Sequence, residues 1–228
     1  MRTHPVKRLL RGVLLWALGL IALFYALALA ELVALRWVDP PTTTVQAQRR
    51  IEAWLHHRPY RKQYVFVPLD RISLHLQHAV ISAEDGRFYD HHGIDWKEVQ
   101  QVIDQDMEEG RLGRGASTIT QQLVKNLFLT TSRSLVRKAV EFTLAPVAER
   151  LLSKQRILEL YLNVIEWGPG VYGAEAAARS WYGVPAARID REQAARLAAL
   201  IPSPLRRKPA RMSGYSAEIL RRMAQRSW

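Results

Sequence analysis

The sequence predicts a mostly α-helical domain behind one N-terminal membrane-spanning helix. Residues 12–30 form an uncharged apolar run, and much of the later chain repeats apolar residues at helical spacing after residues that cap helices. A single short run, residues 64–67, has the composition of a strand. At 228 residues and 48% hydrophobic content, the chain suits one folded domain over residues 42–228, after an N-terminal part over residues 1–41.

The N-terminal apolar run has the length of a bilayer crossing. As a helix, residues 12–30 span about 28 Å, close to the roughly 30 Å of a membrane core, so we expect a transmembrane helix over about residues 12–35. The basic residues before it predict a cytoplasmic N-terminus and a domain outside the cytoplasm: Arg2, Lys7, Arg8 and Arg11. A cleaved signal peptide is the alternative, because Ala28-Leu29-Ala30 resembles a cleavage site.

The domain after this helix carries a series of helix signals. An apolar run over residues 78–83 is helix-like, and Asp95 with Glu98 forms a capping box before an apolar stripe of Trp96, Val99, Ile103 and Met107. Further helices are expected to start at Ser117, Ser134, Ser153, Asp190 and Ser216, with Pro146 kinking or ending the second of them. Pro40–Thr44 is expected to be a spacer.

Charge and cysteine content narrow the classes of function. The net charge is +12, most of it on residues 42–228, and there is no cysteine, which excludes disulfides, thiol nucleophiles and thiolate metal sites. A basic domain held at a membrane is expected to associate with anionic headgroups or phosphorylated lipids. Nucleic acid is disfavoured as a partner because the domain faces away from the cytoplasm. A solvated basic surface is the alternative.

The helix expected after Ser117 separates an apolar face from a polar one. Ile119, Leu123 and Leu127 share the first, while the second carries Thr118, Gln121, Gln122 and Lys125. Two amides suit sugar hydroxyls, and an ammonium suits a phosphate. The alternative interpretation is that this polar face is only exposed to solvent and binds no ligand. The preceding loop, residues 109–116, holds three glycines and two arginines at a helix N-terminus, which favours either an anion site or a mobile surface loop.

Carboxylates and histidines supply the other candidate groups. Glu84 ends an apolar run, where burial raises the pKa of a carboxyl and makes it a usable base. His91 and His92 lack another histidine at metal-ligand spacing, so a structural role is favoured over a metal site. Glu141 follows Arg137 and Lys138 at helical spacing, and a surface ion pair is the default interpretation.

Four motifs in order carry a resemblance to a known family. They are E-D-G-R-F-Y-D-H-H-G over residues 84–93, G-A-S-T-I-T-Q-Q-L-V-K-N over 115–126, R-K-A-V-E over 137–141 and K-Q-R-I-L-E-L-Y-L-N over 154–163. With these motifs the chain resembles the peptidoglycan glycosyltransferases of glycosyltransferase family 51, over roughly residues 60–225.

The resemblance implies a lysozyme-like, mostly helical fold and an enzyme that polymerises peptidoglycan strands from lipid II. It implies that Glu84 is the general base for the 4-hydroxyl of GlcNAc, and that undecaprenyl pyrophosphate leaves with inversion to a β-1,4 linkage. Glu141 would orient cations or hold a divalent ion. The residues expected to bind substrate or pyrophosphate are Ser117, Gln121, Gln122, Lys125, Asn126, Arg133, Arg137 and Lys138.

The remaining implications concern scaffold, surroundings and chemistry. Asp85, His91 and Glu159 would be scaffold, residues 109–116 a flap, and Leu112 and Phe128 membrane contacts. No cofactor is required, with Mg²⁺ or Mn²⁺ as the candidate ion at Glu141. Expected partners are lipid II, the nascent glycan, membrane lipid and cell-wall or division proteins. The expected location is the inner membrane, with a single pass and a periplasmic catalytic domain, and without a transpeptidase activity.

Two other functions remain open from the sequence. A lysozyme-like hydrolase or lytic transglycosylase would also use a glutamate in a helical cleft. A non-catalytic envelope scaffold would not depend on Glu84 at all.

Overall fold

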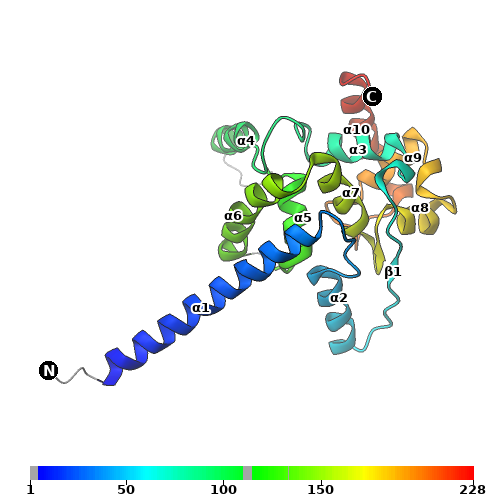
Figure 1. The fold of residues 1–228 in the computed structure, drawn as a ribbon. Helices are drawn as coiled ribbons and strands as arrows, with labels where there is room; N and C mark the ends of the chain where they lie inside the picture. The colour runs from blue at the N-terminus through cyan, green and yellow to red at the C-terminus, as the bar shows by residue number, and fades with distance from the viewer. Residues whose placement is uncertain (1–4, 110–114, 133) are drawn as a thin grey trace. The chain divides into compact units, whose positions relative to one another are not determined.

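The computed structural model describes residues 5–109, 115–132 and 134–228 (Figure 1). The chain divides into two compact units, the first ending at Val38 and the second covering Asp39–Trp228. In the first unit, α1 runs over Pro5–Ala34. Its segment Arg8–Ala34 is 27 residues long with a mean hydropathy of 2.5, so by length and composition it can cross a membrane, a test that a signal sequence also passes.

The second unit is built mainly from helices. They are α2 (Thr44–Leu55), α3 (Leu74–Glu84), α4 (Trp96–Glu109), α5 (Ile119–Phe128), α6 (Leu135–Leu151), α7 (Lys154–Val164), α8 (Ala174–Tyr182), α9 (Arg191–Ala198) and α10 (Ser213–Gln225). Short 3₁₀ turns lie at Leu69–Arg71, Ala186–Arg188 and Pro209–Arg211. The mostly helical prediction is therefore confirmed.

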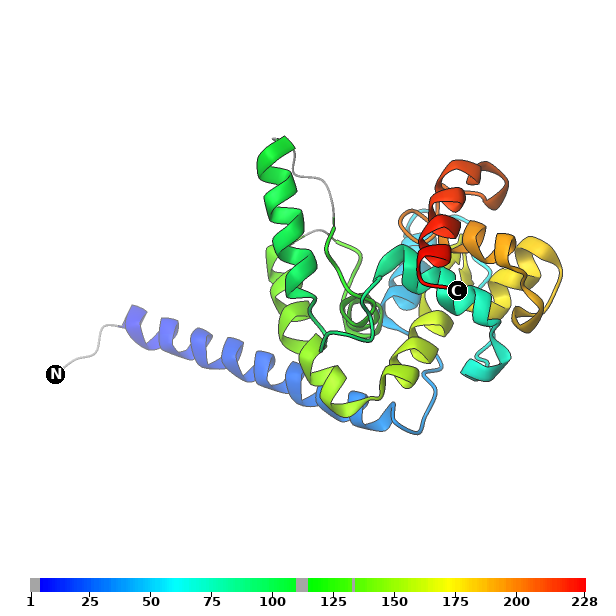
Figure 2. The ribbon, with the colours of Figure 1, turned by 90° about the horizontal axis from the view of Figure 1, so that it is seen from above.

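Two groups of helices form the frame of this unit. α3 packs against α9 and α10, while α5 packs against α2, α6 and α7. Figure 2 shows α4 and α6 on one side of the unit and α3, α9 and α10 on the other. The core follows α5 and α7, because Ile119, Leu123, Ile157 and Leu160 are all fully buried. The carboxyl end of α3 lies where these two groups meet, and it positions the site described below.

A small sheet accompanies α8. Its strands are β1 (Gln63–Tyr64), β2 (Glu166–Gly168) and β3 (Val171–Tyr172), in the order β1-β3-β2. β1 pairs parallel to β3, and β2 pairs antiparallel to β3. The predicted strand over residues 64–67 is therefore wrong beyond Tyr64, and the sequence interpretation missed β2 and β3. β1 depends on a partner about 100 residues away, whereas β2 and β3 pair with each other and are too short to give a clear local pattern.

Most predicted helix starts are confirmed, with two corrections. Ser134, Ser153 and Asp190 cap α6, α7 and α9, and Asp95 Oδ1 accepts the first amides of α4. The cap of α5 is Thr118 and not Ser117, because Thr118 Oγ1 accepts from Gln121 N. α10 begins at Ser213, three residues before Ser216.

The apolar stripe expected on α4 is largely exposed. Trp96 is 65% exposed and Met107 is 79% exposed, while Val102 on another face is buried. The ring of Trp96 contacts Phe142 of α6, but that contact covers only part of the stripe. Helical spacing identified the helix correctly, and its apolar stripe is not the face that is buried. Pro146 lies inside α6, which continues to Leu151.

Candidate active site

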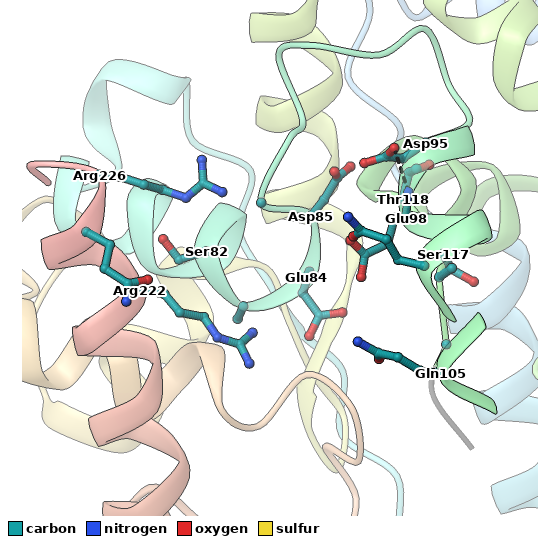
Figure 3. A pocket seen from close by; sticks show the side chains of 16 residues that line it. Ser82, Glu84, Asp85, Asp95, Glu98, Gln105, Ser117, Thr118, Arg222 and Arg226 are labelled. Atoms are coloured by element: carbon teal, nitrogen blue, oxygen red, sulfur yellow. Dashed lines mark hydrogen bonds between the residues drawn. The ribbon is translucent and has the colours of Figure 1, made fainter. Parts of the chain in front are cut away.

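Glu84 lies at a wall shared by two chambers of the second unit. The cationic chamber, of about 620 Å³, is lined by Gln122, Lys125, Arg137, Lys138 and Glu141 together with residues of the C-terminal segment. The mixed chamber, of about 370 Å³, is lined by Glu84, Glu98, Gln101, Gln105, Ser117, Arg222 and Arg226, among others. Figure 3 shows Glu84 between two arginines, Arg222 of α10 and Arg226 just after it, and the side chains of Glu98 and Ser117. One carboxylate thus faces two cavities of different charge.

A chain of two hydrogen bonds holds Glu84. Gln122 Nε2 donates to Glu84 Oε2 at 2.7 Å, and the hydroxyl of Tyr161 donates to Gln122 Oε1 at 2.9 Å. Burial raises the pKa of Glu84, although the hydrogen bond from Gln122 and the charges of Lys125 and Arg207 oppose that rise. A carboxylate with a raised pKa accepts a proton more readily than an exposed one.

The residue after Glu84 ties α3 to the start of α5. Asp85 Oδ2 accepts from the backbone amide of Ile119 at 2.9 Å, and Asp85 also bonds His91 Nε2 at 3.0 Å. His91 Nδ1 accepts from Gly93 N, so the ring proton lies on Nε2 and is donated to Asp85. Thr118 Oγ1 donates to the carbonyl of Gly93 at 2.6 Å. These bonds bring the polar face of α5 beside Glu84.

Gly93 makes this close approach sterically possible. Its φ is +92°, and an added Cβ would lie 2.8 Å from the backbone of Ala145 in α6. A glycine adopts this conformation without strain, whereas a larger residue would push α6 away. The turn between Asp85 and α4 therefore packs directly onto the helix that carries the cations of the chamber.

Among the described residues, five basic side chains and two carboxylates line the cationic chamber. Glu141 is 3% exposed and forms ion pairs with Arg137 and, at 3.2 Å, with Lys138. Lys138 Nζ also donates to Ser117 Oγ at 2.8 Å. Burial, with the charges of Arg137 and Lys125, lowers the pKa of Lys138 to about 8. Burial likewise lowers the pKa of Lys125, because few polar groups solvate it.

This arrangement can perform two kinds of chemistry at once. The carboxylate can take a proton from a hydroxyl in one chamber, while cations stabilise negative charge that develops in the other. The positive charges are preorganised by Glu141 and Ser117, so little rearrangement is needed when an anion forms between them.

Comparison with known proteins assigns the family. The Transglycosylase family model matches residues 49–226, which is most of the chain. The chain belongs to this family. It is 42% identical to the biosynthetic peptidoglycan transglycosylase of Azoarcus sp. (strain BH72), with 95% of each chain covered. It is 45% identical to the protein of that name from Dechloromonas aromatica, with 86% of this chain and 85% of the relative covered. A further relative of that name, from Pseudomonas entomophila, is 42% identical, with 99% of this chain and 93% of the relative covered.

The transglycosylase fold brings together most of the residues selected from the sequence. The selected residues that line the cationic chamber are Glu84, Ser117, Gln122, Lys125, Arg137, Lys138 and Glu141. They come from α3, from the segment before α5, and from α5 and α6. The membership also confirms the lysozyme-like fold that the motifs implied.

Two of the selected residues lie elsewhere. Gln121 is fully buried, and its Oε1 accepts from Thr118 N in the capping box of α5, so its side chain does not line either chamber. Asn126 is 6% exposed, and its amide donates to the carbonyl of Gln122. Both side chains hold α5 in this structure, and their contact with substrate stays a prediction.

Other selected positions are scaffold or lie outside the described residues. Glu159 Oε1 accepts from the amide of Leu69, and its other oxygen pairs with Arg156. Phe128 is half-buried at the end of α5. Arg133, Leu112 and most of the loop 109–116 lie outside the described residues. Among the described residues, no group of three histidine or acidic side chains is placed to hold a metal, and His91 is bonded to Asp85.

Three residues of the chamber were missed by the sequence interpretation. Arg207, Tyr215 and Arg222 line it from the segment before α10 and from α10 itself. Arg207 donates to the carbonyl of Ala199 at 2.7 Å, and its guanidinium lies 5.5 Å from the ring centre of Tyr215. The basic run over residues 206–208 was the available signal, but nothing in its spacing pointed toward Glu84.

Proposed function

We propose that the chain polymerises peptidoglycan glycan strands, with Glu84 as the general base and the cationic chamber as the pyrophosphate site. The transglycosylase family membership supports the reaction class. The observation that carries the assignment of roles is the position of Glu84, because its carboxylate borders a chamber lined by Lys125, Arg137 and Lys138. Its substrates are lipid II and the growing chain on undecaprenyl pyrophosphate.

The reaction is a single displacement. Glu84 accepts the proton of the 4-hydroxyl of the acceptor GlcNAc, and the oxygen forms a bond to C1 of the donor MurNAc. The bond between C1 and the pyrophosphate oxygen breaks, and its electron pair leaves on the pyrophosphate. The configuration inverts to a β-1,4 linkage, and the proton on Glu84 passes to solvent.

The two chambers suit the two partners of this reaction. The leaving pyrophosphate gains charge in the transition state, and Lys125, Arg137 and Lys138 stabilise it there. The acceptor sugar lies in the mixed chamber, where the amides of Gln101 and Gln105 suit its hydroxyl groups. Glu84 Oε2 is bonded to Gln122, so Oε1 is the oxygen that faces the acceptor.

A glycan-cleaving reaction fits these side chains less well. A glycosidase needs a second carboxylate as a nucleophile or as a base for water. Glu141 is the second carboxylate of the cationic chamber, and Arg137 and Lys138 occupy its two oxygens. An ion-paired carboxylate is a weak nucleophile, whereas the same cations serve a departing pyrophosphate well.

The same ion pairs bear on the proposed divalent ion. Mg²⁺ and Mn²⁺ prefer several oxygen ligands. Of the two carboxylates that line the cationic chamber within the described part of the chain, one is Glu84, which is bonded to Gln122, and the other is Glu141. Two cations already neutralise it, so this set of residues does not fit a resident metal. Glu141 instead orients the two basic side chains.

The helix α1 fits a single-pass anchor in the inner membrane. The basic residues before it favour a cytoplasmic N-terminus and a periplasmic catalytic domain. An anchor confines the enzyme and its lipid substrate to one surface and so raises their effective concentration for each other.

The test is polymerisation of lipid II by the full chain, with Glu84→Gln as the variant. We expect the wild-type chain to make glycan polymer and the variant to lose at least about a hundredfold in rate, because general-base catalysis is commonly worth that much. One parallel reaction contains finished glycan in place of lipid II. Two others contain lipid II with either EDTA or Mg²⁺. Shortened glycan would support a cleaving enzyme. Near-normal turnover by Glu84→Gln would remove the assignment of Glu84 as the base. Total loss of polymerisation in EDTA would restore Glu141 as a metal ligand.

A further inference from the structure

We infer that Tyr161 is a positioning residue that fixes the orientation of the Gln122 amide and thereby directs an N–H group at the catalytic base. This inference rests on the proposed role of Glu84. Tyr161 belongs to α7, is fully buried, and lies behind Gln122 as seen from Glu84, outside both chamber linings. It acts through Gln122 and does not contact substrate.

The argument begins with the two ends of an amide. Gln122 can present either its oxygen or its NH₂ group to Glu84, and the two orientations occupy almost the same volume. The hydroxyl of Tyr161 donates to Gln122 Oε1, which leaves Nε2 to face Glu84 Oε2. Burial raises the pKa of Tyr161 well above its ordinary value, so the phenol keeps the proton that it donates.

The orientation matters because the base must be ionised to work. An N–H group that faces a carboxylate stabilises its charged form, whereas an amide oxygen in that place stabilises the protonated form. Burial already favours the protonated form of Glu84. The hydrogen bond from Gln122 thus stabilises the ionised form of Glu84, which can accept a proton. The hydroxyl of Tyr161 determines that the NH₂ end of the amide, and not its oxygen, faces Glu84.

Other charged groups also face Glu84, and they do not depend on Tyr161. They are Asp85 next in the chain, Lys125 of α5, Arg207 from the segment before α10, Arg222 of α10, and, across the mixed chamber, Glu98 of α4 and Arg226 after α10. Lys125 and Arg207 favour the ionised form, and Asp85 opposes it. None of these groups changes when the hydroxyl of Tyr161 is removed, so a shift in that variant reports on the amide alone.

The experiment compares the pH profile of polymerisation for the wild-type chain and Tyr161→Phe. Phenylalanine keeps the packing of the ring and removes the donor, which frees the amide of Gln122 to turn. We expect the acid limb of kcat to move to higher pH by about one unit, because one charge-assisted hydrogen bond to the ionised base is weakened. KM should change less than kcat, and activity should recover at the high-pH side of the limb.

A matched control is Tyr172→Phe. Tyr172 is also fully buried, but its hydroxyl bonds Tyr60 and Glu166 beside the small sheet. Both variants lose one buried hydroxyl, so thermal unfolding measures the shared structural cost. We expect the acid limb of Tyr172→Phe to match that of the wild-type chain.

A second comparison tests whether Tyr161 acts through Gln122. Gln122→Ala alone and together with Tyr161→Phe should give nearly the same kcat, because the hydrogen-bond path from the phenol to Glu84 runs through that amide. Additive losses would overturn the inference, and so would an unmoved acid limb in Tyr161→Phe. Activity in Glu84→Gln would instead overturn the base assignment itself, so the two failures are distinguishable.

Discussion

Lys125 is the residue whose charge most directly supports the proposed leaving group. It lies near Glu84 and Arg137 in the cationic chamber. We expect Lys125→Ala to lower kcat about a hundredfold or more, since one lost preorganised charge commonly costs that much. The control is Lys97→Ala on the exposed side of α4, which should remain close to wild type. Equal losses in the two variants would argue against the pyrophosphate role.

The charge of Lys138 is expected to make the rate of polymerisation depend on pH in the alkaline range. Its pKa is lowered to about 8, so its charge is present below that pH and is lost as the pH rises through it. We expect polymerisation to fall above about pH 8 for this reason. Lys138→Arg keeps the charge at all these pH values and should move the alkaline limb upward. An unchanged limb in that variant would assign the titration to another group.

Gln121 illustrates which part of the site the residue pattern could predict. A helical wheel places it with Gln122 and Lys125 on the polar face, but the wheel treats every position as mid-helix. Gln121 is the third residue of α5, where an amide can reach back to the cap, and it does so. Gln122, one residue later, has no such partner in the cap and turns toward Glu84.

At the scale of elements, the start of α5 determines the geometry of the site. Thr118 caps this helix and also bonds the carbonyl of Gly93, so one hydroxyl serves two segments. We expect Thr118→Val to lower the free energy of unfolding by about 1–2 kcal/mol, measured by chemical denaturation. It should also lower kcat, because Gln122 and Lys125 move with the helix.

The matched control for that variant is Ser153→Ala at the cap of α7. Ser153 Oγ accepts a single hydrogen bond, from the backbone amide of Arg156, and Ser153 is exposed. We expect a loss of stability of about 1 kcal/mol without a comparable loss in kcat. If both variants lost activity in proportion to stability, the start of α5 would have no special link to catalysis.

Local signals explain why helix caps were predictable and strands were not. Ser134, Ser153 and Asp190 act on amides two or three residues away, so the sequence contains the whole interaction. The pairing of Gln63 with Val171 joins segments that are remote in the chain, and no local pattern encodes it. Arg207 and Arg222 reach the chamber for the same reason, through the packing of α10 against α3 and α9.

At the scale of the whole molecule, the order of the four motifs predicted the function better than any single motif did. Composition and spacing led to an anchored basic domain with a sugar-like or phosphate ligand, but they named no reaction. Four motifs in order identified the family, which the match over residues 49–226 confirms. The face of α4 that stays exposed could not be deduced in this way, because spacing defines a stripe without saying what covers it.

The anchor gives a prediction that belongs to the whole chain. A chain that begins at Asp39 retains the second compact unit but lacks α1. With substrate in liposomes, we expect its rate to fall at least about tenfold relative to the full chain, because confinement to one surface is lost. In detergent micelles the two chains should differ by no more than a few-fold. A similar loss in detergent would mean that α1 supports folding of the second unit.

The bond between Asp85 and the amide of Ile119 joins the neighbour of the base to the first residue of the helix that carries Gln122 and Lys125. Together with the hydrogen bond from Gln122 to Glu84, it holds the proposed proton acceptor beside the start of α5. The amide of Ile119 exchanges with deuterium only when this contact opens, so its rate of labelling reports how often α3 and α5 come apart at the site.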